Sequence, residues 1–201
     1  MADARTLIRP IILIAAIAVA GCATIRQTDP PQTATQQLLV STAIDRSAAK
    51  LKLALSPGSR IFVDAQHVDA DENIQYPKYT IAAVREQLLR QGLRLVGDRV
   101  TADAIVELRS GAQSINEKKI LLGIPEMALP VPFTGPVTIP ELAIFKYHRL
   151  NGVAKLALAA YRPDGTLLFA TDFQYGEAEQ KDWTLLFFIS HKSHDLWPGE
   201  R

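Results

Sequence analysis

The chain has 201 residues, with 22 basic and 21 acidic side chains and a net charge of +1. This balance argues against a nucleic-acid-binding protein, which would carry a basic excess, and the single cysteine excludes an internal disulfide. The length is enough for one domain with a sizeable core.

The N-terminus carries a targeting signal. Arg5 and Arg9 precede the apolar run 11–20, which leads directly into Gly21 and Cys22. A basic start, a short apolar segment and small residues before a cleavage point predict a secretory signal over residues 1–21. The run is too short to span a bilayer, which takes about 20 apolar residues. The stretch VAGC resembles the lipobox of bacterial lipoproteins, although an ordinary cleaved signal next to an unrelated cysteine is the alternative.

The lipobox resemblance implies cleavage after Gly21 and a lipid on Cys22, which would become the new N-terminus. Ala23 follows the cysteine, where an aspartate commonly favours retention in the inner membrane of such proteins. We therefore expect an outer-membrane lipoprotein that faces the periplasm. Without residues 1–21 the chain has no net charge, which argues against electrostatic recruitment to a membrane.

The rest of the chain alternates helix and strand patterns. Residues 22–36 are polar and predict a lipidated tether. Periodicity and turn signals then predict a helix over 37–55, a strand over 60–65, a helix capped by Thr80 and stopped at Gly92, and strands over 93–96 and 104–110.

Residues 120–140 are apolar but contain five prolines and two glycines. Proline removes a backbone donor, so neither a regular helix nor a central strand should run through this segment. We expect either a contact surface or an irregular cover over one edge of the sheet. The candidate contact residues are Leu122, Ile124, Met127, Leu129, Val131, Phe133, Val137 and Ile139.

The C-terminal third predicts further strands. Asn151-Gly152 predicts a hairpin turn between strands 143–147 and 153–161. The run 167–175 alternates as one strand. The apolar stretch Trp183–Ile189 predicts a buried core strand, with a second piece of the contact surface as the alternative, and 191–201 predicts a polar tail.

Together these elements indicate an α+β fold: a mostly antiparallel sheet covered on one face by two helices, with a proline-rich apolar insertion. Residues 37–190 would form the single periplasmic domain.

Two resemblances support this organisation. The order IFVDA, AAVREQLLRQGLRLV and TADAIVELRSGA is similar to βαββ modules of envelope lipoproteins and secretion-associated periplasmic proteins. The longer stretch from Thr35 to about Trp183 resembles an uncharacterised family of bacterial lipoproteins, through QQLLVSTAIDRSAAKL, ADAIVELRSGA, GIP, PELAIFK and GVAKLALAAY. This resemblance implies a fold and a location in the cell envelope, but it implies no reaction.

No residue set predicts catalysis. The acidic loop 64–72 and the pair His191 and His194 are weak candidates for metal binding, and we expect no catalytic residue, metal or cofactor. The sequence favours a non-enzymatic interaction or assembly module of the cell envelope, anchored to the membrane at Cys22. Its partner would be an envelope protein or a second copy. The alternative is a carrier of a small hydrophobic ligand or lipid, with 120–140 lining a cavity.

Overall fold

A computed structural model describes residues 32–66, 68, 76–131 and 135–196, with backbone only for 129–131 and 135–137. Residues Thr33–Arg201 form one compact unit. Gly21, Cys22 and most of the predicted tether lie outside the described residues. The elements are α2 (Ala34–Lys50), β1 (Arg60–Asp64), α3 (Tyr76–Arg90), β2 (Arg94–Leu95), β3 (Ala104–Ile124), β4 (Met127–Val131), β5 (Gly135–Ile139), β6 (Leu142–Tyr161), β7 (Leu167–Ala170), β8 (Gln174–Leu185) and β9 (Ile189–His194).

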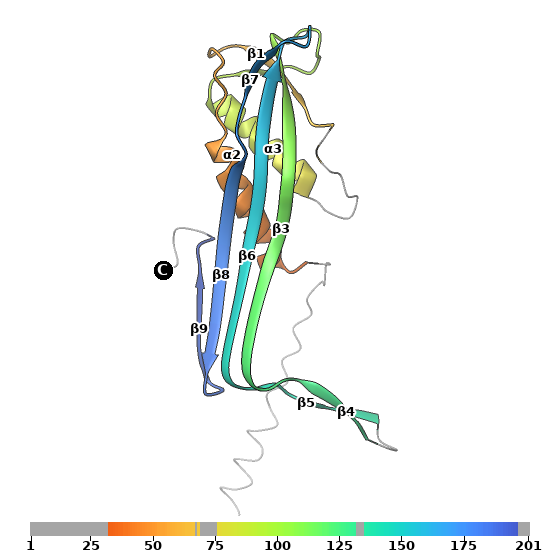
Figure 1. The fold of residues 1–201 in the computed structure, drawn as a ribbon, viewed down its shortest axis with the longest axis vertical. Coiled ribbons are helices and arrows are strands. Elements are labelled where there is room, and N and C mark those ends of the chain that lie inside the picture. Colours follow the sequence, from red (N-terminus) through yellow and green to blue (C-terminus); the bar gives the residue numbers. More distant parts are fainter. Residues whose placement is uncertain (1–31, 67, 69–75, 132–134, 197–201) are drawn as a thin grey trace, which may run out of the picture. The chain divides into compact units, whose positions relative to one another are not determined.

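The main sheet has the strand order β2-β1-β3-β6-β8-β9, and β7 also pairs with β6. β1 pairs in parallel with β2 and β3, and the other pairs are antiparallel. Figure 1 shows α2 and α3 together on one side of this sheet. The α+β prediction, with two helices on one face of a mostly antiparallel sheet, is therefore confirmed. We call the side that carries the helices the helix face and the other side the open face.

The core lies between the helices and one half of the sheet. Ile44 of α2 and Val84 and Leu88 of α3 are fully buried against residues of β3 and β6, among them Leu108 and Leu158. Beyond this core, β3, β6 and β8 continue as a long three-stranded ribbon that extends past the helices (Figure 1).

Helix α2 begins earlier and ends earlier than predicted. Thr33 and Gln36 form a capping box, in which each side chain accepts the other residue's backbone N–H. The helix stops at Lys50 because the side chain of Gln91, the residue after α3, bonds to the extended segment that follows. Its amide donates to the Leu51 carbonyl at 3.0 Å and accepts the Leu53 N–H at 2.9 Å. These bonds replace those of a continued helix.

Thr80 does not cap the second helix, which already begins at Tyr76. Thr80 is fully buried inside α3, and its hydroxyl donates to the Tyr76 carbonyl at 2.8 Å. Back-bonding of this kind satisfies a threonine hydroxyl inside a helix. The predicted stop is confirmed, since α3 ends at Arg90, two residues before Gly92.

The predicted hairpin at Asn151-Gly152 is wrong, because β6 runs through both residues without a turn. Gly152 instead lets α2 approach the sheet. A Cβ at position 152 would stand 2.5 Å from the Leu39 carbonyl oxygen, and one at Gly176 of β8 would stand 1.8 Å from the Ala43 carbonyl oxygen. Glycine at these two positions leaves the space that the helix backbone occupies.

The proline-rich segment is more regular than predicted. β3 continues to Ile124, just before the first proline of the segment, and β4 and β5 then pair as a separate two-stranded ribbon in which Pro130 lies opposite Pro136. Both strands of such a ribbon are edge strands, where a missing N–H costs no ladder bond on the free side.

Three predictions for the C-terminal part are corrected. The run 167–175 is divided between β7 and β8. The segment from Trp183 to Ile189 is not core, because Trp183, Leu185, Phe187, Phe188 and Ile189 are all exposed. Residues 191–194 of the predicted polar tail instead belong to β9, which pairs along β8.

Candidate functional site

The far end of the three-stranded ribbon, where β9 adds a fourth strand along β8, carries apolar side chains in cross-strand rows. Residues directly opposite in paired strands share a face of the sheet. Leu122, Phe145, Leu185 and Ile189 form one such row across β3, β6, β8 and β9. Two residues further along the strands, Ile120, Tyr147, Trp183 and His191 form the next row.

Both rows lie on the open face. α2 packs over Gly152 of β6, so even-numbered β6 residues from Gly152 to Ala160 face the helices. Side chains alternate along a strand, which directs Phe145 and Tyr147 to the opposite side. The Trp183 and His191 rings confirm the shared face, with centroids 5.6 Å apart.

The turn between β8 and β9 adds three large apolar residues. Leu186 and Phe187 have positive φ angles of 48° and 69°, a conformation uncommon for residues with bulky side chains. The turn is fixed to β6 by two backbone bonds, from the Leu186 N–H to the Ile144 carbonyl at 2.8 Å and from the Phe187 N–H to the Ala143 carbonyl at 3.1 Å. Phe188 is 78% exposed. Turns normally carry glycine and small polar residues, so large apolar residues are unusual at these positions.

We call this region the apolar tip. Its members come from the ends of β3, β4, β6, β8 and β9 and the turn, and each is between 37% and 78% exposed: Ile120, Leu122, Ile124, Met127, Leu142, Ile144, Trp183, Leu185, Leu186, Phe187, Phe188 and Ile189. Contiguous exposed apolar surface of this kind marks interaction sites.

The apolar tip contains part of the predicted contact surface. Leu122, Ile124 and Met127 are exposed, and Ile139 is partly buried. Leu129, Val131 and Val137 lie in β4 and β5, but their side chains, like the whole of Phe133, lie outside the described residues. The sequence favoured a core strand for the 183–189 half, with a second piece of the contact surface as the alternative. The pairing of Phe145 with both Leu122 and Leu185 brings the two halves together.

Cations follow the apolar rows along the open face. The next row contains Lys118, Arg149 and Lys181. Glu179 forms ion pairs with Arg149 and, at 2.5 Å, with Lys181. Within the described part of the chain, Lys118 forms no ion pair.

The helix face at the same end is polar. There Glu117 pairs with Lys119 at 2.7 Å and with His148 at 2.8 Å. The Lys119 ammonium and then His148 hold the pKa of Glu117 below its ordinary value. The ribbon is therefore two-sided, with apolar and aromatic groups on one face and polar groups on the other.

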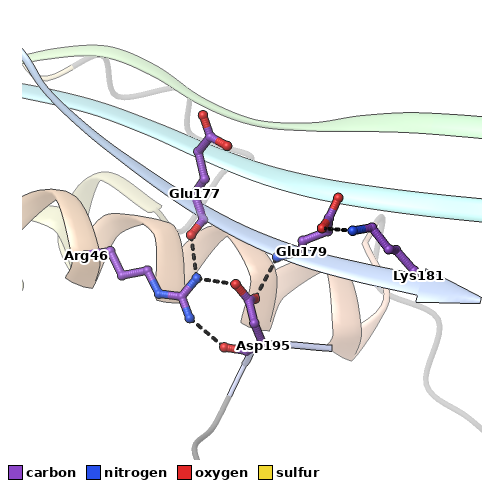
Figure 2. Close-up of polar contacts among 5 residues, drawn as sticks. All are labelled: Arg46, Glu177, Glu179, Lys181 and Asp195. Atoms are coloured by element: carbon purple, nitrogen blue, oxygen red, sulfur yellow. Dashed lines mark hydrogen bonds and ion pairs between the residues drawn. The ribbon is translucent and has the colours of Figure 1, made fainter. Parts of the chain in front are cut away.

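Arg46 of α2 holds the end of β9 against the domain (Figure 2). Its guanidinium donates to the Glu177 carbonyl at 2.5 Å, to the Asp195 carboxylate at 2.7 Å and to the Asp195 carbonyl at 2.5 Å. The other Asp195 carboxylate oxygen accepts the Glu179 N–H at 2.7 Å. This network secures the β8–β9 hairpin, and with it the turn that carries Phe187 and Phe188.

Residues 16–170 match a protein family described as a family of unknown function, DUF6655. The match spans more than half of the chain. The chain belongs to this family. No curated protein matches it. In this DUF6655 member the family match includes the β3 and β6 parts of the apolar tip and ends before the β8–β9 turn.

Two hollows of the DUF6655 chain lie beside α2, away from the apolar tip. The larger, of about 520 Å³, is lined by Arg46, Ala49, Lys50, Tyr175 and Glu177. The second, of about 320 Å³, lies between α2 and α3. At its edge the Tyr79 hydroxyl bonds to both carboxylate oxygens of Asp45 at 3.0 and 2.9 Å. Charged side chains border both hollows, and neither is lined by a residue of the segment 120–140.

The weak metal candidates are not supported. Most of the acidic loop 64–72 lies outside the described residues, and the buried Asp64 forms an ion pair with Arg99 at 3.3 Å. His191 and His194 are three residues apart on a strand, so they point to opposite faces. Within the described ranges, no three histidine, cysteine, aspartate or glutamate side chains gather closely enough to hold a metal ion.

Across the part of the chain that the structure describes, each helix is either too short or too polar to cross a bilayer.

Proposed function

We propose that this protein is a lipid-anchored, non-enzymatic contact module of the bacterial cell envelope. Cys22 carries the lipid after cleavage behind Gly21, and the polar residues that follow connect the lipid to the domain. The sequence features behind this are the basic start, the short apolar run and the VAGC stretch. Ala23 favours the outer membrane, with the domain in the periplasm.

The observation that carries the contact role is the apolar tip. Four strands of the main sheet and one tight turn expose large apolar side chains at the same end. Leaving this much apolar surface in water is unfavourable by about 25 cal/mol per Å², so a surface that covers it would be bound favourably. Anchoring raises the effective concentration of the tip for anything at the membrane.

The carrier alternative has less support. It needs an apolar hollow beneath the segment 120–140, whereas the two hollows described above lie beside α2 and are bordered by charged groups. The exposed apolar end favours contact over transport of a small ligand.

Site-specific photocrosslinking in intact cells tests the proposal. A crosslinking amino acid replaces Leu122, which is 62% exposed at the tip, or Leu167, which is 63% exposed in β7 and serves as the matched control. We expect an envelope adduct from position 122 and none from position 167. Equal labelling at the two positions, or no adduct at 122, would remove the assigned contact role.

A further inference from the structure

We propose that the apolar tip enters the surface of the same bilayer that holds the lipid on Cys22. This inference rests on the proposed function and names the surface that the tip contacts. The domain would then bind its membrane at two points, the acyl chains and the tip.

The order of side chains along the open face matches the layers of a bilayer. The outermost row is Leu122, Phe145, Leu185 and Ile189, the next contains Tyr147 and Trp183, and the third contains Lys118, Arg149 and Lys181. Successive rows are two residues apart, or about 7 Å. Hydrocarbon, the interface preferred by tryptophan and tyrosine, and anionic headgroups follow one another in the same order.

The opposite face limits how deeply the tip can enter. Between the first and second apolar rows, the helix face carries three polar residues and one apolar residue, which pair across β3, β6, β8 and β9: Lys146, Thr184, Ser190 and Leu121. Lys146 also forms an ion pair with Glu141 at 2.6 Å. A two-sided element of this kind lies in the interface, with its apolar side about 5–10 Å deep, and does not cross the membrane.

An uncompensated cation favours a bilayer over a second copy or another protein. Arg149 and Lys181 of the third row share Glu179, whereas Lys118 of that row forms no ion pair among the described residues. Lys118 lies two residues from Ile120 on the same face of β3. A lysine close to an anionic leaflet is attracted to the charged headgroups. An apolar surface alone would suit a protein partner equally well, whereas the aromatic and cationic rows suit headgroups.

The tether also joins the domain on the side of the apolar tip. Along α2, Leu39 packs on Gly152 and Ala43 on Gly176, which lies opposite Ala154. The helix therefore runs away from the tip as its residue numbers rise, and its first residue, Ala34, is on the tip side. Residues 23–32 can span at most about 35 Å, and Phe145 is seven residues, or about 23 Å, from Gly152 along β6. The tether is long enough for lipid and tip to meet one bilayer.

Fluorescence of Trp183 in the lipidated full chain tests this inference. The chain has two tryptophans, and a Trp197→Phe change removes the other one, so that all tryptophan emission comes from Trp183. The protein is reconstituted in vesicles of phosphatidylethanolamine and phosphatidylglycerol with brominated acyl chains, which quench nearby indoles. We expect Trp183 to lose most of its emission, and to recover it in a Phe187→Ser, Phe188→Ser variant but not in the control Leu167→Ser. Lys118→Glu should weaken quenching more than Lys78→Glu does.

The mass of Cys22 in the same sample separates the possible failures. A lipidated Cys22 with unquenched Trp183 overturns this inference and leaves the proposed function standing; a stable dimer in sedimentation of that sample would assign the tip to a second copy. A bare Cys22 overturns the proposed function and the inference together. Equal quenching in brominated phosphatidylcholine vesicles would overturn the role of the cationic row.

Discussion

The backbone of Gly152 in β6 lies directly against that of Leu39 in α2, where a Cβ would stand 2.5 Å from the Leu39 carbonyl oxygen. Backbone atoms cannot move aside as a flexible side chain can, so a larger residue at position 152 would force the helix away from the sheet. Gly152→Ala should therefore destabilise the domain by about 1–3 kcal/mol, the usual cost of overpacking.

Chemical unfolding measures this effect, with Gly97→Ala as the matched control. A Cβ at Gly97 would meet no atom within 4 Å, so that change should leave the free energy of unfolding almost unaltered. Equal stability of the two variants would mean that α2 does not pack against β6 as described.

The same contact shows why part of the fold could not be predicted from the sequence. Asn151-Gly152 is a strong local turn signal, but the packing of a helix distant in sequence decides the outcome. By contrast, the amphipathic helices and the strand at 104–110 follow from local periodicity, and the capping box at Thr33 was available in the sequence but was missed.

Only one of the two segments that form the apolar tip could be proposed as a surface from the sequence. The apolar residues of 120–140 could be proposed as a surface, because prolines interrupt any buried strand. The apolar composition of 183–189 is equally typical of a core strand, since composition alone does not show which side chains are exposed to solvent. Only the pairing of Phe145 with Leu122 and Leu185 brings the two segments together.

The stability that the Arg46–Asp195 ion pair gives to the fold should depend on pH. Burial raises the pKa of Asp195, but the Glu179 N–H and the Arg46 guanidinium outweigh it and leave the pKa below its ordinary value. A lowered pKa stabilises the fold above the unfolded value of about 3.9, and this contribution is lost as pH falls through the folded value.

Thermal unfolding of Asp195→Asn against the parent chain tests this dependence. The variant should unfold at a lower temperature near neutral pH, and the difference should shrink below about pH 4. Asp172→Asn, an exposed carboxylate outside the network in Figure 2, should show no such change. A difference that is independent of pH would assign the effect to packing instead.

The contact between α2 and α3 should weaken in strong base. Burial first, and then the bond to Asp45, raise the pKa of Tyr79 to about 12. The folded state therefore favours the neutral phenol, and its contribution is complete below about pH 10 and is lost as pH rises toward 12. Tyr79→Phe should remove this dependence in unfolding curves recorded at several alkaline pH values. An unchanged slope in the variant would show that Tyr79 is not responsible.

The β4–β5 ribbon should be dispensable for folding. Its two strands pair with each other and with no strand of the main sheet in the described part of the chain. Replacing residues 126–140 by a short glycine-serine linker should leave the thermal midpoint unchanged and keep the pairing of Ile124 with Leu142. A large loss of stability would instead show that the segment is a structural cover.

The lipid on Cys22 is the central claim, because both the contact role and the bilayer assignment depend on it. Intact mass spectrometry of the protein extracted from bacterial membranes tests it most directly. We predict a chain that begins at Cys22 and carries acyl groups on that residue. A chain that still begins at Met1, or one with an unmodified thiol at Cys22, would contradict the account.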